Sequence, residues 1–377
     1  MKMNKWVSIW GNAISVAENK PESYAKDITL RYKIHVPFGG SKLRLTFDNY
    51  CGTEKIEISA VTVMNNGSIS DVHFDGKDNV QIGAGENTVS DELDIVTKRG
   101  DDLYVSFYFA DFTKMRSLVY TQGPLTCGSF AMGNFVHDKE FPAEVSRSTS
   151  LTYFLSNVSV YTDSSNRAIV CYGDSITAQD WPEDLQLLIE EHGIYDTAVI
   201  RRATSGSRIL REYTCITYES YGLMGDKRFD HEVPTDGADT VIIQQGINDI
   251  IHPVGTDVNI WRPMSDLPTV EELFDGFMKY VSKGLSYGYK VYGGTLLPIE
   301  GWRTYATFRE DMKNEYNDLI RSATGLSGVI DFDKAVRNPE HTPAFLPAFD
   351  SGDHLHPSAK GYSKMAEEAF RVLFPES

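Results

Sequence analysis

The first 160 residues alternate between apolar and polar positions in short runs that end at turn residues. Residues 28–36 alternate in this way, and after the turn at 37–40 residues 43–47 alternate again, which predicts a β-hairpin. Turn clusters such as 65–68 and 75–78 separate further runs at 56–63, 103–109 and 151–160. Many short strands without a helical pattern predict an all-β sandwich, of a jelly-roll-like type.

From residue 167 onward, short apolar runs alternate with helical patterns. The helical patterns begin near residue 180, cover 270–281 with apolar residues about 3.6 positions apart, and close the chain at 358–373. This alternation predicts an α/β fold, a parallel sheet covered by helices on both sides. The predicted strands are residues 168–172, 197–201, 240–244, 290–296 and 328–331.

A polar stretch at 162–166 separates the two patterns, so we predict an N-terminal β-sandwich domain at 1–165 and an α/β domain at 166–377. A chain of 377 residues is long enough for two domains, each with its own core.

The composition argues against some classes of binding partner. The formal net charge of −17 argues against nucleic acid and against anionic membrane surfaces, because both need a basic patch. No apolar run is long enough to span a bilayer, and the first residues lack the apolar core of a secretory signal. We therefore expect a cytoplasmic protein, or a secreted one if a leader has been removed. The four cysteines show no zinc-ligand spacing, and no cofactor is expected.

The first candidate for chemistry is Ser175. The apolar run 168–172 stops at Gly173-Asp174-Ser175, so the serine is predicted at the carboxyl edge of the sheet, where open α/β sheets bind ligands. A nucleophile is expected at such a position. The alternative is that Asp174 and Ser175 are ordinary helix-capping residues.

Polar groups follow other strands and precede the last helix. Gly206 lies in the loop after the second strand, Asn248 follows the third, and Asp353 stands three residues before His356. Ester hydrolysis needs a nucleophile, a base, a group that orients the base, and donors for the oxyanion. Ser175, His356 and Asp353 can supply the first three. The Ser175 and Gly206 backbone N–H groups and the Asn248 amide can supply the donors.

Four segments together resemble the SGNH hydrolases, also called the GDSL esterase/lipase family. They are Gly-Asp-Ser-Ile-Thr at 173–177, Ser-Gly-Ser-Arg at 205–208, Gly-Ile-Asn-Asp-Ile at 246–250 and Asp-His-Leu-His-Pro at 353–357. They occur in the family's order within residues 167–377. The resemblance implies a three-layer α/β/α, flavodoxin-like sheet. It also implies that Ser175 is the nucleophile, that Asp353 and His356 complete the triad, and that Gly206 and Asn248 complete the oxyanion hole.

Two other segments, 6–11 and 37–45, resemble the β-sandwich that precedes the catalytic domain in one bacterial subgroup of this family. One stretch departs from the family pattern. Arg201-Arg202-Ala203-Thr204 stands where an Asn-Gly pair is expected before Gly206, which leaves the hydrogen bonding around this loop open.

The expected function is a serine esterase that removes short acyl groups, above all acetyl, from a small-molecule or oligosaccharide ester. A lysophospholipase or broad-specificity esterase is the alternative enzyme, and a non-catalytic carbohydrate-binding protein is the alternative class. A metal site built on Asp353, His354 and His356 has too few ligands and no further partner of clear metal spacing, so no metal is expected. Association of identical chains stays open.

Overall fold

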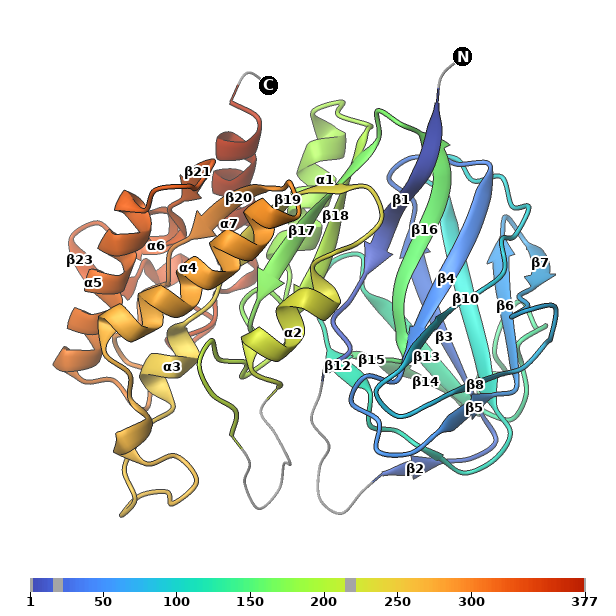
Figure 1. Ribbon diagram of the computed structural model, residues 1–377, viewed down its shortest axis with the longest axis horizontal. Coiled ribbons are helices and arrows are strands. Elements are labelled where there is room, and N and C mark those ends of the chain that lie inside the picture. The colour runs from blue at the N-terminus through green and yellow to red at the C-terminus, as the bar shows by residue number, and fades with distance from the viewer. Residues whose placement is uncertain (1–2, 16–22, 214–221, 376–377) are drawn as a thin grey trace.

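A computed structural model describes residues 3–15, 23–213 and 222–375. Figure 1 shows a β-rich region built from the N-terminal part of the chain beside an α/β region built from the C-terminal part. The expected fold class, an all-β sandwich followed by a parallel α/β sheet, is confirmed.

Two antiparallel sheets form the β-rich region. Side chains along their strands alternate between buried and partly exposed positions, as along β4 (Lys42–Asp48), so one face of each sheet is apolar. The apolar faces meet in a shared core, where Phe47 of one sheet lies edge-to-face with Phe107 of the other at 5.1 Å. The four-stranded sheet has the order β1 (Asn4–Gly11), β16 (Leu155–Asp163), β4 (Lys42–Asp48), β9 (Asn87–Val89). The six-stranded sheet has the order β14 (Ser146–Thr149), β13 (Cys127–Met132), β3 (Ile28–His35), β10 (Asp102–Phe109), β6 (Ala60–Asn65), β7 (Ser68–Asp71).

Short strand pairs close the ends of this sandwich. They are β11 (Thr113–Lys114) with β2 (Tyr24–Ala25), β12 (Leu118–Tyr120) with β15 (Leu151–Tyr153), and β5 (Ile56–Ile58) with β8 (Val80–Ile82).

The hairpin predicted from residues 28–36 and 43–47 is wrong. β3 pairs with β10 and β13, whereas β4 pairs with β16 and β9, so the turn between them carries the chain from one sheet to the other. Alternation fixes which face of a strand is apolar but does not fix its partner. The strand predicted at 151–160 is also divided, because Phe154 has a positive φ of 57° and separates β15 from β16.

The α/β region contains a five-stranded parallel sheet, and all five predicted strands are present. The strand that leads to Ser175, β17 (Arg167–Gly173), lies inside the sheet and is buried from Ala168 to Gly173, as expected for a strand covered on both faces. In order across the sheet the strands are β18 (Thr197–Ala203), β17 (Arg167–Gly173), β19 (Ala238–Gln244), β20 (Lys290–Gly294) and β21 (Gly328–Ile330).

Helices cover this sheet in two layers, with α1 against α7 and α4 against α5 (Figure 1). Within the described ranges, no helix has the length and apolarity needed to cross a membrane. The α-helices are α1 (Trp181–Glu191), α2 (Gly225–Glu232), α3 (Ile247–Ile251), α4 (Val270–Ser286), α5 (Thr307–Ser322), α6 (Phe332–Val336) and α7 (Ala359–Leu373). The remaining elements are the hairpin β22 (Arg337–Asn338) and β23 (His341–Phe345) and the 3-10 helices η1 (Met264–Asp266) and η2 (Pro347–Phe349).

The two regions meet along β1 and β18 (Figure 1), and two buried arginines of β18 join them. Arg202 donates to the Asn12 and Ser156 carbonyls, both at 2.6 Å. Arg201 donates to the Asn12 side chain at 3.0 Å and to the Gln122 carbonyl at 2.7 Å. The stretch that departs from the family pattern therefore supplies several of the polar contacts between the regions. The predicted division at residue 165 falls in the turn between β16 and β17, and the independence of the two domains stays a prediction.

Candidate active site

Ser175 lies in a tight turn directly after β17. Gly173 ends the strand where a Cβ atom would lie 2.4 Å from Thr177 Oγ1 and 2.6 Å from the Gln244 carbonyl oxygen, so only glycine fits. The side chain of Asp174 is fully buried and accepts a hydrogen bond from the Ile176 N–H at 3.1 Å. Burial raises the pKa of Asp174 to about 7. The turn leaves Ser175 partly exposed at the sheet edge.

Ser175, His356 and Asp353 are hydrogen-bonded in series. Ser175 Oγ lies 2.9 Å from His356 Nε2, and His356 Nδ1 lies 2.7 Å from Asp353 Oδ2. Because a carboxylate only accepts hydrogen bonds, Nδ1 carries the proton and Nε2 is free to accept from the serine hydroxyl. The other Asp353 oxygen accepts from the Leu355 and His356 backbone N–H groups at 2.9 and 2.8 Å. Burial alone would raise the pKa of Asp353, but the hydrogen bonds from His356 and the backbone outweigh it and hold that pKa well below its usual range.

The loops that carry Gly206 and Asn248 lie against the same edge. The Thr204 N–H donates to the Gly173 carbonyl at 3.2 Å, which ties the Gly206 loop to the serine turn. Gly206 has a φ of +78°, a conformation that favours glycine. The Asn248 amide donates one hydrogen to the Ser207 carbonyl at 3.1 Å and has a second hydrogen left.

Asp249, the residue after Asn248, holds the end of the Gly206 loop in place. The buried Asp249 carboxylate accepts from the Ile209 N–H at 2.8 Å and from the Leu210 N–H at 3.0 Å. The structure therefore links Ser175, His356 and Asp353 by direct hydrogen bonds. Gly206 and Asn248 are linked to the Ser175 turn indirectly, because Thr204 bonds to Gly173 and Asn248 bonds to Ser207.

Two polar residues that the sequence analysis missed support the Gly206 loop. Arg228, fully buried in α2, donates to Ser207 Oγ at 2.7 Å and to the Gly173 carbonyl at 3.3 Å. Gln245 donates to the same Ser207 hydroxyl at 2.9 Å. Arg228 lies in a short helix of mostly polar residues, outside the four segments that resemble the family, so the sequence pattern did not single it out. Gln245 directly precedes the predicted Gly246–Ile250 segment, and that position was its only signal.

A loop after β20 borders both histidines of the segment 353–357. Trp302 lies edge-to-face with the His356 ring at 6.5 Å. His354 packs against Gly301, where a Cβ atom would come within 2.6 Å of the ring carbon Cγ. His354 is also paired with Asp350, whose Oδ2 lies 2.6 Å from His354 Nδ1. The two neighbouring histidines thus have separate carboxylate partners.

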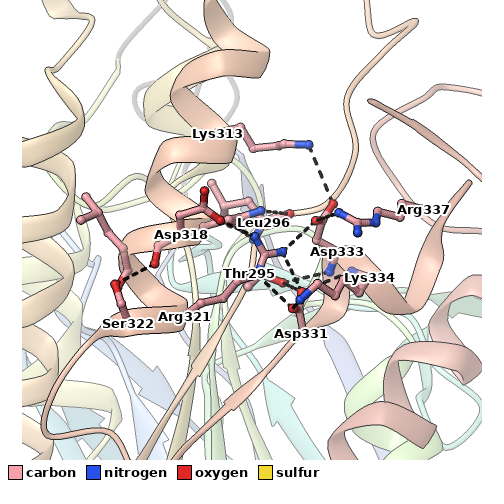
Figure 2. Close-up of polar contacts among 12 residues, drawn as sticks. Thr295, Leu296, Lys313, Asp318, Arg321, Ser322, Asp331, Asp333, Lys334 and Arg337 are labelled. Atoms are coloured by element: carbon pink, nitrogen blue, oxygen red, sulfur yellow. Dashed lines mark hydrogen bonds and ion pairs between the residues drawn. The ribbon is translucent and has the colours of Figure 1, made fainter. Parts of the chain in front are cut away.

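A charged cluster lies at the carboxyl ends of β20 and β21 (Figure 2). Arg321 pairs with Asp331 and Asp333, both at 2.9 Å, and the buried Lys313 pairs with Glu310 at 2.8 Å. Burial opposes ionisation of Asp331, but the Arg321 guanidinium lowers its pKa to about 2. Because these charges pair with one another across α5 and α6, the cluster joins the two helices.

Metal-ligating side chains do not gather in the described part of the chain. Residues 3–15, 23–213 and 222–375 contain no group of three or more His, Cys, Asp and Glu side chains that could hold a metal ion. Cys51, Cys127 and Cys171 are free thiols, and Cys215 lies outside the described residues.

A parallel α/β sheet with a serine, an imidazole and a carboxylate bonded in series at its carboxyl edge has the architecture of a serine hydrolase. The family comparison agrees. The chain belongs to the GDSL-like lipase/acylhydrolase family, whose model matches residues 171–364. The matched range contains Ser175, Gly206, Asn248, Asp353 and His356. The protein is therefore a hydrolase, as the sequence predicted.

The α/β region is also similar to solved structures at low identity. A lipase/acylhydrolase from Enterococcus faecalis is 23% identical, with a TM-score of 0.42, over 55% of this chain and 95% of that one. An acetylxylan esterase from Geobacillus stearothermophilus is 18% identical, with a TM-score of 0.42, over 56% of this chain and 95% of that one. A GDSL-like lipase from Bacteroides thetaiotaomicron is 18% identical, with a TM-score of 0.40, over 56% and 89%. No curated protein sequence matches this chain.

Proposed function

We propose that this protein is a serine esterase that hydrolyses short acyl esters, acetyl esters above all, of a polar, carbohydrate-like alcohol. The observation that carries the proposal is the pair of hydrogen bonds from Ser175 Oγ through His356 to Asp353, 2.9 and 2.7 Å long. The first distance is within the range for proton transfer from Ser175 to a general base, and the second is that of a hydrogen bond that orients the imidazole. The net charge of −17 disfavours an anionic lipid surface as the site of action.

The proposed reaction begins when His356 Nε2 takes the Ser175 hydroxyl proton as Oγ attacks the ester carbonyl. Asp353 stays a carboxylate, fixes the imidazole tautomer and stabilises the imidazolium that forms. His356 then gives the proton to the leaving alcohol, which departs as the acyl group becomes bonded to Ser175. A water molecule, deprotonated by His356, attacks this acyl-enzyme. The bond between the acyl carbon and Ser175 Oγ then breaks, His356 returns the proton to Oγ, and the acid is released.

The tetrahedral intermediates of both steps carry negative charge on the former carbonyl oxygen. We assign its stabilisation to the Ser175 N–H, the Gly206 N–H and the second hydrogen of the Asn248 amide. One such donor contributes about 3 kcal/mol to barrier lowering in serine hydrolases. The hydrogen bonds of Arg228 and Asp249 to the same loop support this role, because they hold the loop in one conformation before substrate binds.

The test is hydrolysis of 4-nitrophenyl acetate, butyrate and octanoate by the wild-type protein and by Ser175→Ala. We expect kcat to be largest on acetate and to fall by about 10⁴-fold or more in the variant. Ser165→Ala, in an exposed turn, is the matched control and should keep wild-type activity. Wild-type rates in folded Ser175→Ala would refute the mechanism, and rates that rise with chain length would refute the short-acyl preference.

A further inference from the structure

We infer that a cleft between the β-rich region and the α/β region binds the alcohol moiety of the ester, and that this moiety is neutral and rich in hydroxyl groups, as in a saccharide. The inference rests on the proposed function, because the alcohol moiety belongs to the ester that Ser175 is proposed to attack. Two segments of the β-rich region, 121–126 and 149–150, form one wall of the cleft. The N-terminal parts of α1 and α7 form the other.

Ser175, Asp353 and His356 do not line the cleft themselves, but two residues of its wall lie close to them in the chain. Its wall includes Asp180, five residues after Ser175, and Ala359, three residues after His356. An extended chain spans at most about 3.6 Å per residue, so Ala359 lies within about 11 Å of His356. The Gln122 N–H also donates to the Ala178 carbonyl at 3.2 Å, which joins the β-rich wall to the serine segment itself. The cleft has a volume of 570 Å³, within the range of about 300–1,000 Å³ typical of ligand sites.

Buried hydrogen bonds hold the β-rich wall in place. Glu183 of α1 accepts from the Leu125 N–H at 2.6 Å and from the Thr126 N–H at 2.9 Å. Its other oxygen accepts from the Thr126 hydroxyl at 2.6 Å and from Arg201 at 3.0 Å. Gly123 makes this approach possible, because a Cβ atom there would lie 2.2 Å from the Glu183 carboxylate. The wall is therefore formed before a ligand binds, which lowers the entropic penalty of binding.

The lining indicates the chemistry of the ligand. It combines hydroxyl groups, the Gln122 amide and the carboxylates of Asp180 and Asp184, and it includes no Lys, Arg or His from the described residues. Burial raises the pKa of Asp184 to about 6, so an anionic ligand would be repelled wherever this carboxylate is ionised. A simple cation would use only the acceptors, whereas a saccharide uses donors and acceptors together.

Thr121 adds an unpaired polar group at the wall of the cleft. This residue lines the cleft and is fully buried, and its hydroxyl has no hydrogen-bond partner within the described residues. A buried hydroxyl without a partner is unfavourable in a native structure. Because no part of Thr121 is exposed, a ligand hydroxyl pairs with it only once this side chain turns toward the cleft.

A second cavity, of 210 Å³, lies farther along the boundary between the regions. Among the described residues that line it, no buried polar side-chain atom lacks a hydrogen-bond partner. Its charged groups are already paired: Arg44 with Asp236 at 2.7 Å and His231 with Asp48 at 2.6 Å.

Two variants test the cleft on two kinds of ester. Ser363→Trp fills the cleft from an exposed position on α7, and Arg371→Trp places the same side chain two turns farther along that helix as the control. The substrates are 4-nitrophenyl acetate, whose alcohol is small and planar, and the sugar esters glucose 6-acetate and partially acetylated xylo-oligosaccharides, which keep free hydroxyl groups. We expect Ser363→Trp to lower kcat/KM on the sugar esters about tenfold or more, through KM, and to change it less than twofold on 4-nitrophenyl acetate.

Thr121→Val removes only the unpaired hydroxyl. We expect it to raise KM on the sugar esters severalfold, to leave kcat and the nitrophenyl ester unaffected, and to leave the melting temperature unchanged or higher. A lower melting temperature with unchanged KM would assign the hydroxyl to the fold instead and overturn its role in binding.

The outcomes separate the two proposals. A wild-type protein that hydrolyses 4-nitrophenyl acetate but no sugar ester overturns the saccharide site and leaves the esterase intact. Equal losses on both substrates in Ser363→Trp overturn the assignment of the cleft to the alcohol moiety. Inactivity of the wild-type protein on every ester overturns the proposed function itself.

Discussion

Two carboxylate–imidazole pairs occupy one short loop before α7, and they differ in what the rest of the molecule gives them. Asp350 with His354 and Asp353 with His356 have nearly the same bond length, 2.6 and 2.7 Å. The second nitrogen of His356 meets the Ser175 hydroxyl, and its side chain is 23% exposed. The His354 side chain is 48% exposed and packs on Gly301. A carboxylate partner orients an imidazole, whereas the group on the far nitrogen decides whether the imidazole can act as a base.

Replacing each histidine tests this difference most strongly. We expect His356→Ala to lower kcat on 4-nitrophenyl acetate by about 10⁴-fold or more, because no other base contacts Ser175 Oγ in the described residues. His354→Ala should stay within about threefold of wild type, since its ring contacts neither Ser175 nor His356 directly. Steady-state kinetics of both variants, with circular dichroism to confirm folding, measure the contrast. Equal losses of kcat in the two variants would show that both histidines act through the loop as a whole and would contradict the different roles assigned to them.

The carboxylates give the next largest effect. Asp353→Asn keeps an oxygen for the backbone N–H groups of residues 355 and 356 but no longer selects the correct imidazole tautomer. We expect kcat to fall by roughly 10²–10⁴-fold. Asp350→Asn is the matched substitution on the other pair and should lower kcat less than tenfold. If Asp353→Asn retained wild-type kcat, Asp353 would be a structural cap of the loop and nothing more.

The smallest expected effect concerns stability, and it compares two carboxylates with opposite pKa shifts. Hydrogen bonds lower the pKa of Asp353, whereas burial raises that of Asp174 to about 7. A carboxyl whose folded pKa is raised retains its proton in the folded state. Its contribution to stability is therefore fully present below about pH 4 and is lost as the pH rises toward 7, by up to about 1.4 kcal/mol per pH unit.

We expect Asp174→Asn to flatten this part of the stability profile, as measured by urea denaturation at several pH values between 4 and 8. Ser175→Ala changes the neighbouring residue without removing a carboxyl and should keep the wild-type slope. An unchanged slope in Asp174→Asn would show that Asp174 is not the titrating group.

The strands of the α/β region were predicted better than those of the β-rich region. All five strands of the parallel sheet were predicted, because short apolar runs bounded by glycine and polar residues are local features. The hairpin from residues 28–36 and 43–47 was wrong, because an alternating strand pairs equally well with several partners. The packing of the two sheets selects β10 and β13 for β3.

The arginine pair shows what a departure from a family pattern can mean. In the sequence, Arg201 and Arg202 were notable only because they belong to a stretch that lacks the Asn-Gly pair expected before Gly206. In the structure their guanidinium groups point to the other region and bind Asn12, Gln122 and Ser156. Their partners lie far away in the chain, so no local pattern could have revealed this role.

The type of each major element and the order of the chemical groups at the ends of the strands can be predicted from the sequence, because periodicity and strand ends are properties of neighbouring residues. The pairing of the sandwich strands, the distances between Ser175, His356 and Asp353, and the contacts of the β-rich region with the α/β region depend on the folded structure. Ser175 and His356 are 181 residues apart, and the packing of α1 and α7 on the sheet brings their segments together. Contacts of that range depend on the whole fold, so a sequence can name their members but cannot fix their geometry.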